Sequence, residues 1–329
     1  MHDVAARQEG RHSIPAAEPL DDAIGAQEGG FDSKEQLHMT SAGTPMAAAS
    51  GTITIGGDIT VRRLGFGAMR LTGPGIWGLP RDRDEAKAVL RRALELGINL
   101  IDTADSYGPD VSENLIAETL YPYPQDLVIA TKGGLLRAGP GQWSPDGRPE
   151  HLREALEGSL RRLKLSRIAL YQFHRPDPKV PFEDSLGALI ELQRAGKIQH
   201  IGLSNVTTGQ LAQARKIGPI VSVQNRYNLT DRASEDVLEV CTRDGLAFIP
   251  WNPLAIGELT HEGGPLGDIA QRHQAAQSEI ALAWLLKRSP GMLPIPGTSS
   301  VRHLEENVAG AGIALTQEEF DQLSGLGEE

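Results

Sequence analysis

The segment DEAKAVLRRALELGINLIDTA, residues 84–104, contains the unit on which the predicted fold is built. Its first part, residues 84–97, has apolar residues at helical spacing and ends at Gly97, a typical helix stop. The second part, residues 99–104, is a short β-rich run in which the apolar residues give way to Asp102. A helix and a strand that alternate along a chain predict parallel strands joined by right-handed crossovers.

The same alternation continues over most of the chain. There are eight β-rich runs, at residues 63–69, 99–104, 127–132, 168–174, 198–204, 220–225, 246–251 and 292–296. Helical patterns lie between the runs, and eight such units are the number that closes a barrel. An open, doubly wound sheet is the alternative, but no G-x-G-x-x-G opens a helix after the first run. We therefore predict an α/β fold, a (β/α)8 TIM barrel.

Two features precede the first run. TITIGGDITV, residues 52–61, alternates apolar and polar residues around a Gly-Gly-Asp turn, which predicts a β-hairpin that caps the barrel. Residues 1–50 are rich in Ala, Gly, Pro, Ser and acidic residues and have no period, which predicts a disordered N-terminal tail. The expected domains are a tail at 1–50 and a barrel at 51–329.

Composition narrows the classes of partner and the location. The formal net charge is −11 and no basic run is present, which argues against nucleic acid and against anionic membrane surfaces as partners. Cys241 is the single cysteine, so no internal disulfide can form. No stretch approaches the ~20 apolar residues of a membrane span, and the N-terminus lacks an apolar signal core. We expect a cytoplasmic protein; its oligomeric state is not readable from the sequence.

Ionisable side chains gather where successive runs end, the face at which barrel enzymes carry their chemistry. Asp102 and Tyr107, Lys132, and His174 follow the second, third and fourth runs. A free tyrosine has a pKa of about 10, and a nearby ammonium lowers it. Lys132 could supply this ammonium, and Asp102 could keep it charged and oriented. His174 could donate a hydrogen bond to a carbonyl oxygen. This set predicts a proton donor aimed at an oxygen, without a metal, for the reduction of C=O to CH–OH.

These residues lie in motifs that resemble those of the aldo/keto reductase superfamily, in the same order, from about Thr52 to Leu323. The motifs are IDTADSYG (101–108), IATK (129–132), QFHRPD (172–177), IGLSN (201–205), QNRYN (224–228) and IPGTSSVRHLEEN (295–307). The resemblance implies a catalytic tetrad. Tyr107 would be the general acid/base and Lys132 would lower its pKa, while Asp102 would pair with Lys132 and His174 would orient the carbonyl.

A nicotinamide cofactor is implied, because no amino-acid side chain supplies a hydride. The resemblance implies contacts to the nicotinamide carboxamide from Ser204, Asn205 and Gln224, and stacking of Trp251 on its ring. The remaining contacts implied on this side are the loop 253–260 against the pyrophosphate, through Pro253, Leu254, Ile256 and Gly257, and Gly67, Ala68 and Met69 near the ribose.

The segment 297–307 bears on the choice between NADPH and NADH. Its hydroxyls could bind a 2′-phosphate where a helix begins, and its last residues match adenine contacts of the family. Many members have Lys where this chain has Gly297 and Arg where it has His303, and both cations bind the 2′-phosphate. Arg302, adjacent to His303, is a candidate to replace them. We predict NADPH as the cofactor. Without the two cations, the protein should exclude NADH less strictly than other members do. The residues implied are Gly297, Thr298, Ser299, Ser300, His303, Glu306 and Asn307.

The sequence leaves the substrate open beyond a small-molecule carbonyl compound. Parts of the chain resemble a bacterial group linked to pyridoxal/pyridoxine reduction, which makes pyridoxal the leading candidate and a bulky cyclic ketone of xenobiotic or sugar origin the alternative. Trp77 could line the substrate pocket or cover the barrel rim. Two other classes remain: a Schiff-base aldolase with Lys132 as nucleophile, and a regulatory subunit that senses cofactor.

Overall fold

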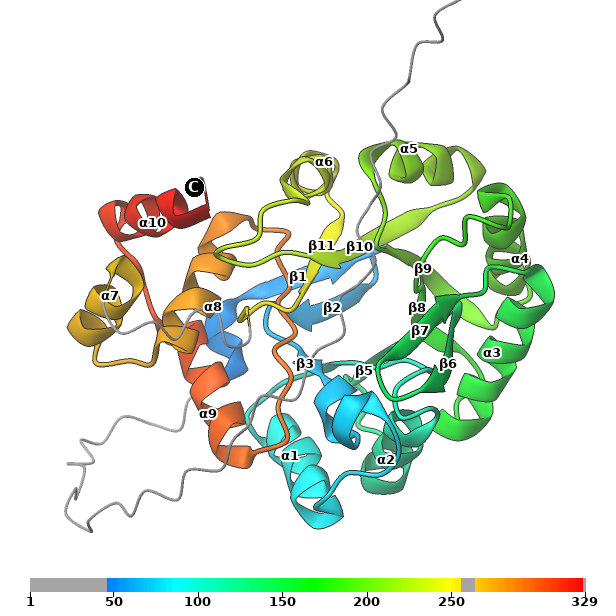
Figure 1. Ribbon diagram of the computed structural model, residues 1–329, viewed down its shortest axis with the longest axis horizontal. Helices are drawn as coiled ribbons and strands as arrows, with labels where there is room; N and C mark the ends of the chain where they lie inside the picture. Colours follow the sequence, from blue (N-terminus) through cyan, green and yellow to red (C-terminus); the bar gives the residue numbers. More distant parts are fainter. Residues whose placement is uncertain (1–45, 256–263, 328–329) are drawn as a thin grey trace, which may run out of the picture. The chain divides into compact units, whose positions relative to one another are not determined.

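The computed structural model describes residues 46–255 and 264–327, which contain a curled, seven-stranded parallel sheet surrounded by helices (Figure 1). The strands lie in the order β11-β10-β9-β8-β5-β4-β3. Their bounds are β3 (Phe66–Gly67), β4 (Leu100–Asp102), β5 (Val128–Gly133), β8 (Ile168–Phe173), β9 (Ile198–Ser204), β10 (Ile220–Arg226) and β11 (Ala247–Trp251). Seven of the eight predicted runs are therefore strands, although the first is only two residues long.

The eighth run, residues 292–296, completes the ring without being a regular strand. On one side Leu293 donates its N–H to a carbonyl of β11 at 2.9 Å, and on the other Gly65, just before β3, donates to the Pro294 carbonyl at 2.9 Å. Pro294 and Pro296 have no N–H to donate, so a continuous ladder cannot form here. Because this closing segment is bonded on both sides, the prediction of a barrel is confirmed.

Helices cover the outside of the sheet, with α1 to α5 following the chain around it (Figure 1). Their bounds are α1 (Arg83–Glu95), α2 (Val111–Leu120), α3 (Pro149–Leu163), α4 (Phe182–Arg194), α5 (Thr208–Ile217), α6 (Glu235–Asp244), α7 (Pro265–His273), α8 (Gln277–Arg288), α9 (Val301–Ala309) and α10 (Gln317–Ser324). The α1 helix begins where the Asp82 carboxylate accepts the N–H of Glu85, and the chain turns after it at Gly97, with φ of 82°. None of the helices within the described residues is long and apolar enough to cross a bilayer.

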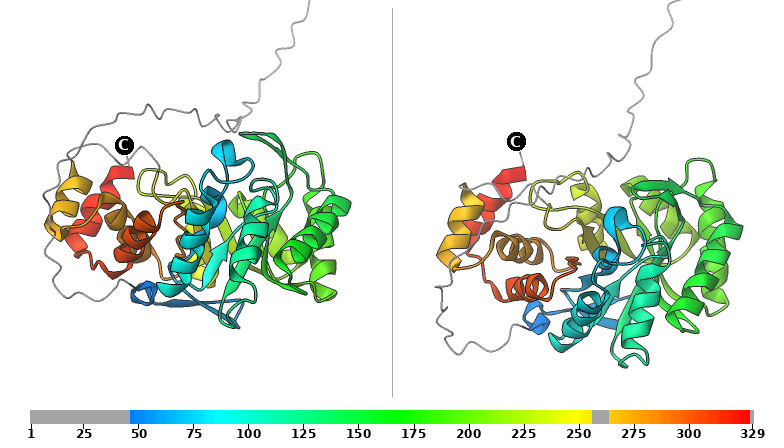
Figure 2. Two further views of the ribbon diagram at one scale, coloured as in Figure 1. Left: turned by 90° about the horizontal axis from the view of Figure 1, so that it is seen from below. Right: turned by 60° about the horizontal axis from the view of Figure 1, so that its bottom comes forward.

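The predicted hairpin is present as β1 (Thr52–Ile55) and β2 (Ile59–Arg62), paired antiparallel. Ile55, Ile59 and Val61 are buried in one cluster with inward residues of the barrel strands, such as Leu100 and Leu170. Figure 2 (left) places this hairpin at one end of the barrel, opposite the light blue segment that follows β3. The hairpin therefore caps the barrel at the end away from that segment.

The boundary of the predicted N-terminal tail needs a correction. Residues 46–50 were included in it, but Ala47–Ser50 form a short 3-10 helix, η1. Ala47 is fully buried, and its N–H donates to the Leu96 carbonyl at 2.8 Å. These backbone and side-chain contacts make the segment part of the folded unit. Residues 1–45 lie outside the described part of the chain.

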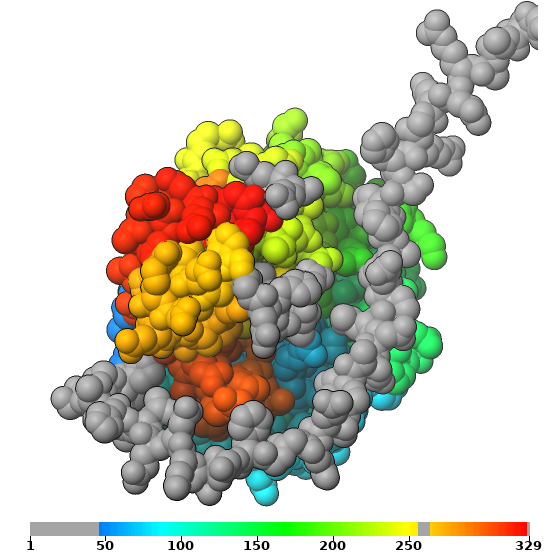
Figure 3. All heavy atoms as spheres, turned by 60° about the vertical axis from the view of Figure 1, so that its left-hand side comes forward, coloured from blue at the N-terminus to red at the C-terminus, as the bar shows by residue number. Residues whose placement is uncertain are grey.

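Two insertions were not predicted. Between β5 and α3 the chain forms a second antiparallel hairpin, β6 (Leu135–Gly139) and β7 (Gln142–Pro145). After β11, the helix α7 packs beside α10, and the two lie next to each other on the surface in Figure 3. The hairpin follows Lys132 directly in sequence, which brings it to the face where the strands end.

Candidate active site

Lys132 lies at the carboxyl end of β5 and is completely buried. Its Nζ donates three hydrogen bonds: to Asp102 Oδ1 at 2.5 Å, to the Thr103 carbonyl at 2.8 Å and to Tyr107 Oη at 3.2 Å. Burial lowers the pKa of Lys132, but the adjacent Asp102 and Tyr107 raise it by more, so the net shift is upward. The side chain is therefore a protonated ammonium whose three hydrogens are all used.

Asp102, at the end of β4, is the acceptor at the centre of this arrangement. Besides the ammonium, its Oδ2 accepts Gln172 Nε2 at 2.8 Å and Gln224 Nε2 at 2.9 Å. Gln224 Nε2 also donates to Gln172 Oε1 at 3.1 Å. Gln224 was predicted as a nicotinamide contact, and its NH2 group faces Asp102, so only Oε1 of its amide can meet a cofactor. The signal for Gln172 was its position two residues before His174, on the same face of β8.

Tyr107 lies on the loop after β4, with 7% of its surface exposed. The sequence predicts that Lys132 lowers the pKa of Tyr107. The ammonium does act in that direction, but burial is the larger effect and the net pKa of the phenol is raised. The phenol is thus protonated at neutral pH and hydrogen-bonded to a cation.

His174 completes the group at the end of β8, with its ring centroid 5.9 Å from that of Tyr107. Burial lowers the pKa of this imidazole well below its usual range, and the charges of Lys132 and Arg175 lower it further. The ring is therefore neutral. Ser106 Oγ lies 3.4 Å from its Nδ1. A hydroxyl that donates there leaves the ring proton on Nε2, which can then donate to a ligand.

Sequence reasoning missed an aromatic ring in this group. Trp143, on β7, packs against Tyr107 and against His174 in T-shaped arrangements, with centroid distances of 6.4 and 6.5 Å. Trp77, by contrast, contacts the guanidinium of Arg137, and no ring contact joins it to Tyr107 or His174 in the part of the chain described. This favours the rim position for Trp77. The Pro-Gly pair before Trp143 marks a turn, but it gives no local signal that Trp143 meets Tyr107.

Three of the predicted nicotinamide contacts are linked to one another beside His174. Asn205, at φ of 58°, donates from Nδ2 to the His174 carbonyl at 3.1 Å and to Ser204 Oγ at 2.9 Å. Its Oδ1 accepts the Trp251 indole N–H at 3.1 Å. Trp251 is half-buried. A partly exposed aromatic ring with amide and hydroxyl groups next to it suits a flat, polar ring such as nicotinamide.

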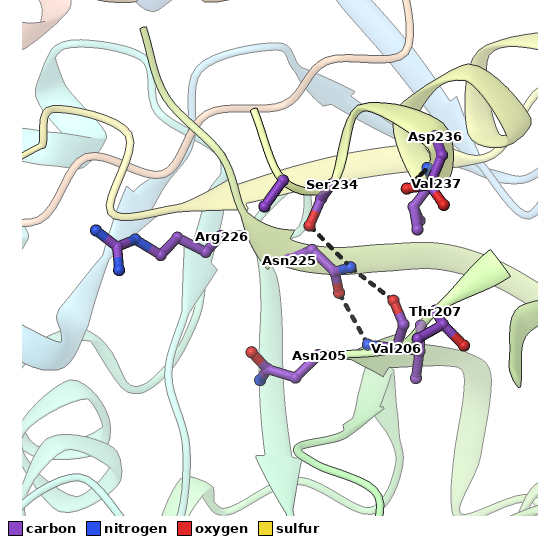
Figure 4. A pocket seen from close by; sticks show the side chains of 9 residues that line it. Asn205, Val206, Thr207, Asn225, Arg226, Ser234, Asp236 and Val237 are labelled. Carbon is purple, nitrogen blue, oxygen red and sulfur yellow. Dashed lines mark hydrogen bonds between the residues drawn. The ribbon is translucent and has the colours of Figure 1, made fainter. Parts of the chain in front are cut away.

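A pocket of 260 Å³ adjoins Asn205 on the outer side of the ends of β9 and β10. Figure 4 shows the Asn225 side chain bridging the Val206 backbone and Ser234, while Asn205 points away from Thr207. The Asn225 side chain is therefore paired within the protein, and Asn205 is the residue that this pocket shares with the site described above.

The remaining predicted contacts lie around the closing segment. Gly67 ends β3, and Ala68 and Met69 begin η2 (Ala68–Leu71). A Cβ on Gly297 would lie 2.6 Å from the Gly67 carbonyl oxygen and 3.6 Å from Arg70 Cγ. The family's lysine therefore cannot stand at position 297 without moving the backbone. Arg70 is exposed, and its side chain has no ion pair or hydrogen bond within the described residues.

Residues 298–307 lead into α9. Thr298 Oγ1 accepts the Ser300 N–H at 3.1 Å, and the Glu85 carboxylate accepts the Val301 N–H at 3.0 Å. An acid thus stands at the helix start where a 2′-phosphate was predicted. Arg302 Nη1 donates to Glu306 Oε1 at 3.0 Å, and its Nη2 lies 2.9 Å from His303 Nε2. The others are placed as follows: Ser299 and His303 exposed, Asn307 buried, Pro253 and Leu254 just after β11, and Ile256 and Gly257 outside the described residues.

An α/β barrel with a buried Asp-Lys-Tyr group and a neutral histidine at the strand ends defines a class of barrel oxidoreductase. The model of the aldo/keto reductase family matches residues 63–328. The chain belongs to this family and is an oxidoreductase that acts between an alcohol and a carbonyl.

Individual relatives cover nearly the whole folded part. An uncharacterized oxidoreductase of Schizosaccharomyces pombe is 52% identical over 282 residues, 86% of this chain and 92% of the relative. Pyridoxine 4-dehydrogenase of Escherichia coli is 45% identical over 288 residues, 85% of this chain and 100% of the relative. The structure of an aldo-keto reductase from Klebsiella pneumoniae in complex with NADPH has a TM-score of 0.70 at 26% identity, covering 84% and 94% of the two chains.

Proposed function

We propose that this protein reduces an aldehyde or ketone to an alcohol with NADPH, and that Tyr107 donates the proton. The observation that carries the proposal is the contact of Lys132 Nζ with both Asp102 and Tyr107, with His174 alongside. A phenol bonded to a buried ammonium can release its proton, because the phenolate that forms is stabilised by the positive charge.

Each side chain has a defined task. Tyr107 gives its proton to the substrate oxygen, and Lys132 stabilises the phenolate that remains. Asp102 balances the charge of Lys132 and fixes its position, with Gln172 and Gln224 holding the carboxylate in turn. His174, neutral, donates a hydrogen bond to the same substrate oxygen and so orients the carbonyl. Because Asp102 and Tyr107 raise the pKa of Lys132, the amine stays protonated and its nitrogen has no lone pair for attack, which argues against the Schiff-base aldolase.

NADPH supplies the hydride when it is bound, so that the carbonyl carbon gains a hydride and its oxygen a proton. Ser204, Asn205 and Trp251 would hold the nicotinamide, and residues 67–69 and 297–300 would contact the rest of the dinucleotide. Since neither position 297 nor Arg302 offers a free cation here, Arg70 is the candidate to meet the 2′-phosphate. The solved family members with NADPH support this choice of cofactor.

Pyridoxal is the leading substrate, and a bulky cyclic ketone is the alternative. The support is the Escherichia coli relative, which is named a pyridoxine 4-dehydrogenase and is matched over its full length. Pyridoxal is the aldehyde that corresponds to the alcohol pyridoxine.

The test measures NADPH consumption with pyridoxal, methylglyoxal and a bulky cyclic ketone, with the alcohol product identified by chromatography. The proposal expects turnover with NADPH that Tyr107→Phe lowers by about 10²–10⁴-fold, and pyridoxine as the product from pyridoxal. Tight NADPH binding without turnover of any carbonyl would favour the regulatory subunit instead. Turnover of the ketone but not of pyridoxal would replace the substrate and leave the reaction class intact.

A further inference from the structure

The hairpin β6–β7 brings two side chains over the ends of the strands. Arg137 and Trp143 lie directly opposite each other in its register. The Arg137 guanidinium carbon is 3.6 Å from the centre of the Trp143 ring, so the two planar groups stack. One face of the indole is therefore covered by the guanidinium, while the residue as a whole remains half-exposed.

The same indole lies beside the two rings that are proposed to bind the substrate oxygen, in a T-shaped arrangement with each. The centroids of Tyr107, His174 and Trp143 form a triangle with sides of 5.9, 6.4 and 6.5 Å. A carbonyl oxygen that accepts hydrogen bonds from both Tyr107 and His174 must lie beside the line that joins these two rings. Whatever group the carbonyl carbon carries then has the Trp143 indole as a neighbour.

Arg137 is a fixed part of the protein and has no donor left for a ligand. Its guanidinium has five N–H groups. They donate to five backbone carbonyls, those of Gly75, Ile76, Ser106, Gly139 and Gln142, at 2.8 to 3.3 Å. Ser106 precedes the proposed proton donor, Tyr107. One side chain thus joins the hairpin, the loop before α1 and the loop of Tyr107.

We propose that Trp143 is a specificity-determining residue and that Arg137 is the positioning residue that holds it. The class of substrate favoured is a carbonyl attached directly to a flat aromatic ring, which lies against the indole. Aromatic pairs of this kind add attraction beyond the area they bury. The inference rests on the proposed function, because it takes the substrate oxygen to lie between Tyr107 and His174.

The experiment compares benzaldehyde with propanal at saturating NADPH, since the two share the reacting group and differ in the ring. Trp143→Ala should raise KM for benzaldehyde about tenfold and leave KM for propanal within about twofold. Trp143→Phe, which keeps an aromatic ring, should bring KM for benzaldehyde most of the way back to the wild-type value. Arg137→Lys, which keeps the charge but loses the fork of donors, should show the benzaldehyde defect with a lower kcat for both aldehydes, because Ser106 loses its donor.

The matched control is Leu136→Ala, on the same strand as Arg137 but on the opposite face, and it should leave both KM values unchanged. Equal KM increases for the two aldehydes in Trp143→Ala, or no increase, would overturn the inference. A second measurement separates it from the proposed function: calorimetric binding of benzyl alcohol to the enzyme with NADP+. Loss of that binding in Trp143→Ala would support the contact between Trp143 and an aromatic ligand even if the wild type reduced no carbonyl. Binding equal to wild type would refute it.

Discussion

Replacing Gly297 by alanine tests the geometry of the barrel closure most directly. A Cβ at this position would lie 2.6 Å from the Gly67 carbonyl oxygen, about 0.8 Å closer than the 3.4 Å at which ordinary contact begins. The obstructing atom belongs to the backbone and cannot rotate away. Relief requires the closing segment to move from β3, where Gly67 donates to the Pro296 carbonyl at 3.4 Å.

The cost follows from these two effects. Overpacking a rigid site destabilises by about 1–3 kcal/mol, and the weakened hydrogen bond adds about 1 kcal/mol. At about 2–4 °C per kcal/mol for a chain of this size class, Gly297→Ala should lower Tm by about 4–16 °C. The assay is thermal unfolding followed by circular dichroism. Gly187→Ala is the control, because a Cβ there meets nothing within 4 Å; in the middle of α4, alanine should raise stability by about 0.5–1 kcal/mol.

Gly297→Lys extends the same test to the cofactor. It introduces the cation that many family members have, but it carries the same Cβ. We expect the loss in Tm to equal that of Gly297→Ala, with no tightening of NADPH binding in a fluorescence titration. A Gly297→Ala protein as stable as the wild type would refute the close approach, and a stable Gly297→Lys protein with tighter NADPH binding would refute the explanation for the missing lysine.

Three other changes have defined outcomes. Tyr107→Phe should lower kcat by about 10²–10⁴-fold while the Kd for NADPH, measured by titration, stays within about twofold; a collapse of NADPH affinity would contradict its role. Glu85→Gln removes an acid from the start of α9 and should tighten NADPH about threefold or more relative to NADH; equal changes for both cofactors would place the 2′-phosphate elsewhere. Burial and Glu113 raise the pKa of Asp105, whose Oδ1 has no partner within the described residues. Below about pH 4 folded and unfolded states both keep its proton, and as pH rises the unfolded state alone ionises, so folding is penalised. Asp105→Asn should therefore raise Tm at pH ~8 and not at pH ~4, and a gain independent of pH would disprove this.

Much of the fold was predictable because each unit has a local signal. The helical spacing of residues 84–97, the stop at Gly97 and the run ending at Asp102 do not depend on distant residues. The closing segment was harder to classify, since Pro294 and Pro296 keep the chain extended but remove the donors that define a strand. The tail boundary was five residues too late because the burial of Ala47 depends on contact with Leu96, distant in sequence.

The site divides in the same way. Asp102, Lys132 and His174 are found at strand ends, and Tyr107 follows in a recognisable motif. The orientation of the Gln224 amide could not be predicted. Its NH2 group donates to Asp102 and to Gln172, and neither contact is visible from the local sequence. Arg137 and Trp143 were missed for a different reason. Their importance comes from carbonyls and rings more than thirty residues away, and a Gly-rich, Pro-containing stretch looks locally like an ordinary loop.

The sparse bonding of the closing segment has a consequence for how the dinucleotide enters and leaves. Neighbouring strands of a parallel sheet are held together by their hydrogen bonds, and this seam between β3 and β11 lacks two backbone donors because of Pro294 and Pro296. The proposed cofactor contacts at residues 67–69 and 297–300 stand on the two sides of that seam. A dinucleotide that touches both sides would bridge this seam, and its exchange with solution would then be coupled to transient separation of β3 from the closing segment.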